Sequence, residues 1–314
     1  MMIEVVSSMF SCICMLLAVA FFTLLERKGL SYFQQRKGPN KVGLMGLPQP
    51  LADAIKLFSK ESIKLTVVNM LPFMICPMLS LFLTMLLWIL YNGFYQVMMG
   101  GLSLIMFLCI SSVSVYSIMG AGWFSNSKYA LLGSIRAVAQ SISYEVSMSL
   151  ILMSCMVMMG SMNLVMIMNY QNWVWLVIVN FFMFMMWFIS SIAETHRSPF
   201  DFAEGESELV SGFNVEYGSV GFAMLFMAEY GNILFMSLLV VVLFFGGGLM
   251  KEMFLGMSLC IMVTVMSWMF IWIRASYPRY RYDLLMYLIW KSYLPSVLCI
   301  LMFMVFLSKI SYIF

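Results

Sequence analysis

The chain has 314 residues, of which 63% are hydrophobic and only 10% are charged. A soluble domain carries about 25% charged residues, whereas many apolar runs of this chain reach the ~20 residues that a helix needs to cross ~30 Å of hydrocarbon. These properties exclude a soluble globular fold, and the formal net charge of +3 does not indicate nucleic-acid binding.

The apolar segments predict an all-α fold, a polytopic bundle of transmembrane helices with about eight spans. We find no internal repeat, linker or low-complexity tract, so we expect residues 1–314 to form a single integral membrane domain. The expected spans are residues 5–25, 70–91, 102–122, 135–160, 173–193, 218–243, 253–273 and 293–313.

Basic residues are distributed unequally between the two sides of this bundle. One side holds residues 26–69, 123–134, 194–217 and 274–292. Together with Arg136 at the adjoining start of the fourth span, this side carries 15 of the 17 Lys and Arg residues, whereas the side of both termini carries only Lys251 and Lys309. Segments rich in Lys and Arg face the cytoplasm or the matrix. An odd number of spans would mix these segments, so the asymmetry supports the count of eight.

Two stretches on the basic side predict amphipathic helices at the membrane interface. One follows Pro48, because proline is favoured in the first helical turn, and the other follows Pro278, with Arg279 and Asp283 four residues apart. The first has an apolar face of Leu51, Ala54, Ile55 and Phe58 and a polar face of Asp53, Lys56 and Lys60, the pattern of an interfacial helix.

Three glutamates lie in or at the end of expected spans. Glu145 and Glu229 are about eleven residues into their spans, where an acidic side chain costs about 2.5–3.5 kcal/mol, and Glu194 directly follows the fifth span. A buried carboxyl group can exchange protons near neutral pH, as a proton relay requires. The alternative is a neutral glutamate that makes a structural hydrogen bond between helices.

Residues 194–217 form the most acidic segment, with six acidic residues against one arginine. Ser198 and Pro199 have the pattern of a helix start, so we expect a helix that carries Asp201, Glu204 and Glu208 on one face. Like charges at this spacing repel one another, and they require cations, protons or basic partners, which residues 26–64 offer with a net charge of +5. A solvated acidic loop is the alternative, but it does not explain the apolar residues between the acids.

No residue pattern predicts a metal or nucleotide site in this chain. The seven cysteines form no C-x-x-C pair, and His196 is the only histidine, so a packing or loop role is the simpler interpretation for it. Residues 38–43 have the glycine spacing of a P-loop, but Leu44 and Met45 follow where Lys and Ser or Thr are needed.

Several motifs along the whole chain resemble one known family, subunit 1 of mitochondrial NADH:ubiquinone oxidoreductase, respiratory complex I. The most specific is the segment 204–217, which reads EGESELVSGFNVEY. The others are LERK at 25–28, QRKGPNKVG at 35–43, DAIKL at 53–57, SNSKYALLG at 125–133, RAVAQ at 136–140, ISYEV at 142–146, MAEY at 227–230 and RYRYD at 279–283. His196 departs from the Asn that the resemblance leads us to expect.

The resemblance implies a subunit that shapes the ubiquinone access tunnel and, next to it, a charged path towards proton-pumping subunits. The residues that match the tunnel are Glu26, Arg27, Arg36, Asp53, Glu204, Glu206, Phe226, Arg274 and Arg279. The residues that match the path are Glu145, Glu194, Asp201, Glu229 and Tyr230, to which we add the neighbouring acids Glu208 and Glu216.

The resemblance also implies how the chain works with other molecules. Ubiquinone is the expected substrate, while FMN and the iron–sulfur clusters are expected in partner subunits, so this chain has no catalytic residues and no independent catalysis. The expected partners are the peripheral-arm subunits at the quinone site, neighbouring membrane-arm subunits and lipids. The expected location is the mitochondrial inner membrane, with both termini towards the intermembrane space.

Two other functions are compatible with the residue pattern alone. An ion-coupled transporter with a carboxylate relay is one, although no span is interrupted by paired Gly or Pro and no repeat is found. The membrane subunit of a related hydrogenase-type complex is the other. The 36 methionines argue against it, because they suggest a mitochondrial code that reads an isoleucine-type codon as methionine.

Overall fold

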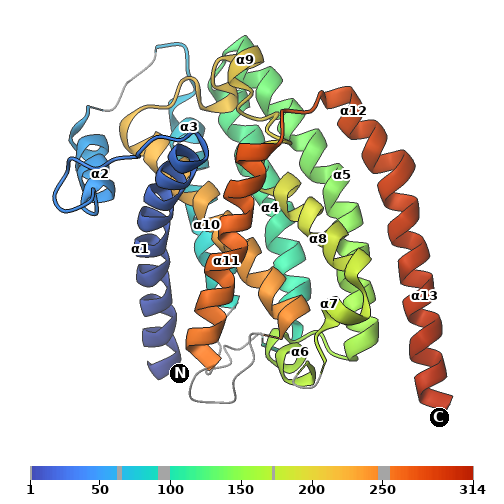
Figure 1. Cartoon of the computed structure of the whole chain (residues 1–314). Helices are drawn as coiled ribbons and strands as arrows, with labels where there is room; N and C mark the ends of the chain where they lie inside the picture. Colours follow the sequence, from blue (N-terminus) through green and yellow to red (C-terminus); the bar gives the residue numbers. More distant parts are fainter. Residues whose placement is uncertain (1, 62–65, 91–99, 172–173, 247–254, 314) are drawn as a thin grey trace.

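The computed structural model describes residues 2–61, 66–90, 100–171, 174–246 and 255–313, and their regular structure is entirely helical (Figure 1). The prediction of an all-α bundle is confirmed, while Lys64 and Lys251 lie outside the described residues. The α-helices are α1 Met2–Phe33, α2 Gln49–Ser59, α3 Met70–Leu90, α4 Ser103–Phe124, α5 Lys128–Met159, α6 Leu164–Tyr170, α7 Leu176–Val179, α8 Phe181–Glu194, α9 Glu206–Leu209, α10 Ser219–Phe245, α11 Leu255–Ser276, α12 Tyr282–Tyr287 and α13 Leu294–Ile313. A π-helical turn, Leu288–Tyr293, joins α12 to α13.

Seven described helical segments are long and apolar enough to cross a membrane, and the shorter apolar helix α8 makes the eighth element. The last of the seven runs without a break from Tyr282 to Lys309, through α12 and α13. Helix α1 begins and α13 ends at the end of the bundle opposite α2 and α9 (Figure 1). Both ends of the chain therefore lie at the same end of the bundle, as an even number of membrane crossings requires.

The predicted fifth span consists of two helices, α7 and α8, that meet at Asn180. The Asn180 side chain accepts a hydrogen bond from the backbone N–H of Met183 at 3.3 Å, so it caps the start of α8. Asparagine is among the strongest residues at this position. The span is therefore interrupted, at an asparagine and not at a pair of Gly or Pro residues.

Helix α10 is the centre of the bundle. It packs against α1, α3, α8 and α11, and 78% of its most apolar stretch is buried, compared with 22% for that of α1. Inside a membrane, close packing and polar contacts hold helices together, because lipid is as apolar as a leucine side chain. Gly231 of α10 illustrates this, since it lies against Met15 and Thr84 and its carbonyl accepts a hydrogen bond from Trp88 at 3.2 Å.

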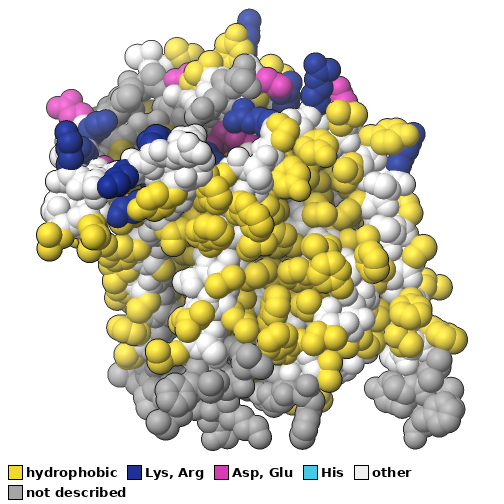
Figure 2. All heavy atoms as spheres, viewed as in Figure 1, with side chains coloured by type: hydrophobic (Ala, Val, Ile, Leu, Met, Phe, Trp, Pro, Cys, Tyr) yellow, Lys and Arg dark blue, Asp and Glu magenta, His cyan; other side chains and the backbone are white. Residues whose placement is uncertain are grey.

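The charged end of the bundle contains more helix than the sequence predicted. Helix α1 continues to Phe33, eight residues beyond the predicted span, and α5 begins at Lys128, so the predicted loop 123–134 shrinks to a short connection. Figure 2 shows Lys, Arg, Asp and Glu side chains gathered at the end that contains α2 and α9, above a largely hydrophobic surface. The helices therefore extend out of the hydrocarbon and carry their charges into the polar region.

The two predicted interfacial helices differ in outcome. Helix α2 is amphipathic as predicted, and its apolar side chains Leu51, Ile55 and Phe58 are exposed rather than packed on the bundle. This orientation suits a helix that places its apolar face in lipid. The second helix begins only at Tyr282, so Arg279 precedes it and the predicted pairing with Asp283 on one helix face is wrong.

Pro77 in the middle of α3 leaves one carbonyl group without a helical partner. The backbone carbonyl of Phe73 would accept a hydrogen bond from the N–H of residue 77, which proline lacks. The hydroxyl of Tyr217 takes this place and donates to the Phe73 carbonyl at 3.2 Å, while the two rings stack with centroids 4.1 Å apart. Tyr217 thereby fixes the end of the acidic segment 194–217 to α3.

Replacing Tyr217 by Phe keeps the stacked ring and removes only the hydroxyl. A buried acceptor without a partner costs about 1–3 kcal/mol, so we expect a lower temperature of thermal inactivation for the protein in its native membrane. In a Pro77→Ala background the helix recovers its own N–H donor, and the same Tyr217→Phe change should cost much less. Equal costs in the two backgrounds would show that the hydroxyl does not serve the Phe73 carbonyl.

Candidate functional site

The buried carboxylate of Glu26 on α1 binds side chains from three other segments. It accepts a hydrogen bond from the hydroxyl of Tyr230 on α10 at 2.6 Å and another from Arg274 on α11, and it lies 3.4 Å from a guanidinium nitrogen of Arg197. We call these four residues the Glu26 cluster. The guanidinium of Arg197 also lies 4.4 Å from the ring centroid of Tyr230, a cation–π contact.

The charge of Arg197 depends on this cluster. Burial by itself lowers the pKa of a guanidinium, but the carboxylate of Glu26 and other nearby acidic groups outweigh it and hold the pKa of Arg197 above its usual value. Arg197 therefore stays charged although its side chain is nearly fully buried. Sequence reasoning assigned no role to this arginine, because it could not show which acid the arginine faces.

Phe226 extends the Glu26 cluster along α10. Its ring lies 6.3 Å from that of Tyr230 and 4.2 Å from that of Phe222, so the three rings form a row at intervals of one helical turn. The predicted tunnel residue Phe226 thus lies beside Tyr230, which in turn binds the predicted tunnel residue Glu26.

Two further tunnel residues of the first loop, Arg27 and Asp53, form a separate pair. Arg27 donates to Asp53 of α2 at 2.6 Å, and Gln49 donates to the other carboxylate oxygen at 2.9 Å, so α2 is tied to the end of α1. This pair is partly exposed, with 54% of the Arg27 side chain and 29% of the Asp53 side chain accessible. Arg36 is exposed and binds Gln34 at 3.0 Å, so it is not part of either group.

The acidic segment 194–217 does not contain the predicted helix from Ser198. Residues 195–205 form turns and irregular backbone, Glu206–Leu209 is a short α-helix and Gly212–Asn214 is a 3₁₀ turn. Gln140 of α5 donates to the carbonyls of Ala193 at 2.9 Å and Phe200 at 2.8 Å, and the N–H of Tyr280 donates to the carbonyl of Pro199 at 3.1 Å. These tertiary bonds take up carbonyl groups that a helix would use internally, so the prediction is wrong.

Three acids of this segment have partners outside the first loop. Asp201 binds Arg279 at 3.1 Å, and the exposed Glu208 binds Arg136 of α5 at 2.5 Å. Glu204 accepts from Asn214 at 3.1 Å, and burial, followed by the carboxylate of Asp201, raises the pKa of Glu204. The expectation that residues 26–64 neutralise these acids is therefore wrong for Asp201 and Glu208. Glu216 is half-buried, and the side chain of Glu206 lies outside the described residues.

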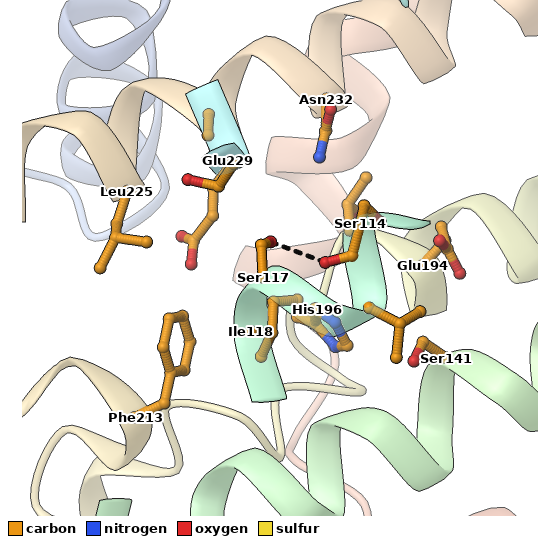
Figure 3. A pocket seen from close by; sticks show the side chains of 14 residues that line it. Ser114, Ser117, Ile118, Ser141, Glu194, His196, Phe213, Leu225, Glu229 and Asn232 are labelled. Carbon is orange, nitrogen blue, oxygen red and sulfur yellow. Dashed lines mark hydrogen bonds between the residues drawn. The ribbon is translucent and has the colours of Figure 1, made fainter. Parts of the chain in front are cut away.

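A second group of predicted residues lines a cavity of about 50 Å³ inside the bundle (Figure 3). Glu229 and Asn232 of α10 border it, together with Glu194 and His196 at the end of α8. Hydroxyl groups complete the wall, contributed by Ser80, Ser114, Ser117, Ser141 and Thr195. The space is sufficient for a few water molecules. Glu145 is half-buried on α5 and is not among the lining residues.

Three polar atoms at this cavity are buried without a hydrogen-bond partner in the described part of the chain. They are one carboxylate oxygen of Glu194, the Nδ1 atom of His196 and the amide oxygen of Asn232. Buried polar atoms nearly always have partners in native proteins, from protein or from ordered water. The cavity is therefore a place for hydrogen-bonded water. Asn232 was missed from sequence, although its spacing of three residues after Glu229 was a usable signal.

Fold and site together define a polytopic membrane protein with buried, charge-paired acids. The family model described as NADH dehydrogenase matches residues 6–305. The chain is 73% identical to "NADH-ubiquinone oxidoreductase chain 1" of Heterololigo bleekeri over 97% of both chains. It is 50% identical to the protein of the same name from Aedes aegypti, over 97% of this chain and 96% of the other, and 52% identical to that of Tetraodon nigroviridis, over 91% and 89%.

The chain therefore belongs to the NADH dehydrogenase family, as a chain 1 subunit of NADH-ubiquinone oxidoreductase. This confirms the resemblance seen in the sequence. It is a membrane subunit of a respiratory oxidoreductase in the mitochondrial inner membrane, and it has partner subunits in that complex.

Replacing Glu26 by Gln tests how much of the fold depends on the Glu26 cluster. Breaking a buried ion pair costs about 3–5 kcal/mol, because the remaining charges stay buried. The control is Glu208→Gln, since an exposed ion pair contributes about 0–1 kcal/mol. We expect Glu26→Gln to reduce the amount of assembled complex and its thermal stability strongly, and Glu208→Gln to leave both nearly unchanged. Equal stability of the two variants would contradict this view of Glu26.

Proposed function

We propose that this chain forms the ubiquinone access tunnel of complex I together with the start of an adjoining proton-coupling path. The observation that carries the proposal is the hydrogen bond between Tyr230 and Glu26. Glu26 and Arg274 match the tunnel of the family, and Tyr230 and Glu229 match its charged path. The bond joins the two sets of residues in one cluster.

The surroundings of α2 support the entry of a quinone from the bilayer. The apolar face of α2 is exposed, as a face in contact with lipid would be, and its polar face carries Asp53, which accepts a hydrogen bond from Arg27 of α1. An apolar mouth suits an isoprenoid tail, and a few placed polar groups suit a head group. Charged groups at this depth are tolerated where protein or water covers them.

Reduction of a quinone by two electrons requires two protons, and negative charge develops on the head group until they arrive. Such charge near Arg274 weakens the hold of this arginine on Glu26 and so favours protonation of Glu26. Protonation of Glu26 alters its hydrogen bond with the hydroxyl of Tyr230 on α10, and the residue before Tyr230 is Glu229, which borders the cavity. A change of charge in the tunnel can in this way affect the protonation of groups at the cavity.

The proposed path continues through the acids of the acidic segment and of the cavity. Asp201, Glu204, Glu208 and Glu216 lie in the acidic segment, Glu229 and Glu194 border the cavity, and Glu145 lies beyond it on α5. Water in the cavity and its serine hydroxyl groups bridge the spaces between carboxyl groups.

The proposal includes the orientation and the partners of the chain. The basic side faces the matrix and both termini face the intermembrane space, because Lys and Arg are concentrated at the end of α2 and α9. Protease access to residues 194–217 from the intermembrane space would contradict this orientation. The electrons come from FMN and iron–sulfur clusters in peripheral-arm subunits at the matrix side. The coupling path continues into the neighbouring membrane-arm subunits.

Asp53→Ala and Arg36→Met test the tunnel. Loss of a hydrogen bond to a charged group is worth about 1.5–3 kcal/mol, or roughly ten- to a hundredfold in rate. We expect Asp53→Ala to slow quinone reduction by at least about tenfold and Arg36→Met to slow it as well, while NADH oxidation by artificial acceptors is kept. Lys60→Gln, at the exposed end of α2, is the control with normal activity. Equal loss of both activities would mean failed assembly instead of a damaged tunnel.

Glu229 and Glu145 test the path through two kinds of substitution. Glutamine keeps the size and polarity but cannot titrate, whereas aspartate titrates with a shorter reach. If these residues carry protons, the Gln variants assemble but lose quinone-linked turnover and pumping, and the Asp variants keep part of both. If the residues only make structural hydrogen bonds, Gln is tolerated and Asp is damaging. Gln variants that pump at the normal ratio would refute the proposed path.

A further inference from the structure

His196 is the only histidine of the chain, and the proposed function gives it no role. The structure places it on the wall of the cavity that Glu194 and Glu229 also border. In the view of Figure 3 its ring is drawn between the two carboxyl groups, below Ser117. This position makes the histidine relevant to any proton movement across the cavity.

The backbone explains how the ring reaches this place. His196 has a φ of 49°, the left-handed conformation that often ends a helix, and its N–H donates to the carbonyl of Ala193 at 3.2 Å. Gly and Asn adopt this conformation most easily. The tight turn after α8 directs Glu194 and His196 to the cavity, while the next residue, Arg197, binds Glu26. Two consecutive residues thus contact the two halves of the proposed site.

The chemistry of the ring suits transfer better than simple packing. Burial lowers the pKa of His196 to about 4, so the imidazole is neutral at physiological pH. A neutral imidazole has one nitrogen that donates and one that accepts a proton. Its Nδ1 atom is buried without a partner in the described residues, and a dry, unpaired nitrogen would cost about 1–3 kcal/mol. The titratable groups that line the cavity with it are Glu194 and Glu229.

We propose that His196 transfers protons between Glu194 and Glu229 across the cavity. One ring nitrogen accepts a proton from the carboxyl group on one side, directly or through water, and the other nitrogen releases its proton towards the carboxylate on the other side. One carboxyl group loses a proton and the other gains one, and the ring changes tautomer. Transfer in the opposite direction, or rotation of the ring, restores the original tautomer. The inference rests on the proposed coupling path, because it names a group within it.

The test uses the assembled complex with His196→Asn and His196→Gln. Both amides keep a donor and an acceptor, and Asn also suits the left-handed turn, but neither exchanges protons at neutral pH. We expect normal assembly, normal NADH oxidation by artificial acceptors, and quinone-linked turnover lowered about three- to tenfold. The loss is smaller than the ~10²–10⁴ of an obligate acid–base group, because water in the cavity remains as a slower route.

Heavy water separates a transfer role from a packing role. If protons pass through the ring, both variants show a larger solvent isotope effect on turnover than the unaltered complex, and the dependence on deuterium fraction changes shape. Turnover and isotope effect equal to those of the unaltered complex would overturn the inference. So would failure of both variants to assemble, since it would make the residue structural.

Glu229→Gln, measured beside them, keeps the two proposals apart. If Glu229→Gln stops pumping while His196→Asn leaves turnover and isotope effect unchanged, the proposed path is supported and the role of His196 is refuted. If Glu229→Gln pumps at the normal ratio, the proposed path itself is refuted.

Discussion

Burial of the Glu26 carboxylate is the constraint on which much of the structure depends. A carboxylate in a low-dielectric interior is stable only with good partners, and here the partners come from α10, α11 and the segment after α8. Each partner joins its own element to α1: Tyr230 joins the central helix α10, Arg274 joins the end of α11, and Arg197 joins the turn that leads into the acidic segment. The pairing of these charges therefore determines how the elements pack together at the polar end of the bundle.

The hydroxyl groups of the cavity wall follow a different rule. Ser114, Ser117 and Ser141 each donate to the carbonyl three residues earlier in their own helix, at 2.7 to 3.0 Å. A serine in a span is thereby satisfied without a partner helix, and its oxygen keeps acceptor capacity towards the cavity. The same cavity is lined by Glu194, His196 and Asn232, each of which has a buried polar atom without a hydrogen-bond partner among the described residues. The wall therefore combines satisfied acceptors with groups that need water.

The sequence was sufficient for the spans and insufficient for their ends and contacts. Hydropathy shows where a segment leaves the hydrocarbon, but a helix continues as long as its backbone bonds are made, and α1 therefore runs past Glu26 to Phe33. The motif that begins at Ser198 satisfied local rules for a helix start, but Gln140 and Tyr280, distant in the sequence, bind the carbonyls that the helix required.

The candidate residues show the same division between local pattern and tertiary contact. Placement in apolar spans singled out Glu145, Glu229 and Glu194, and the structure brings the last two to one cavity. No periodicity could reveal that Arg197 and Arg274 share one carboxylate with Tyr230, because three of the four residues are more than 150 positions from the first. Only the resemblance to a known family assigned Glu26 and Tyr230 to neighbouring functions.

The contact between Pro77 and Tyr217 has a consequence for inheritance. The tyrosine hydroxyl is required by the carbonyl that proline leaves free, and a helix with any other residue at position 77 satisfies that carbonyl by itself. The two positions are 140 residues apart, yet a substitution at one changes the cost of a substitution at the other. Among related chains, a tyrosine at 217 should be freed to drift towards phenylalanine only in lineages that have already lost the proline. The order of the two substitutions on a family tree would then record which change made the other permissible.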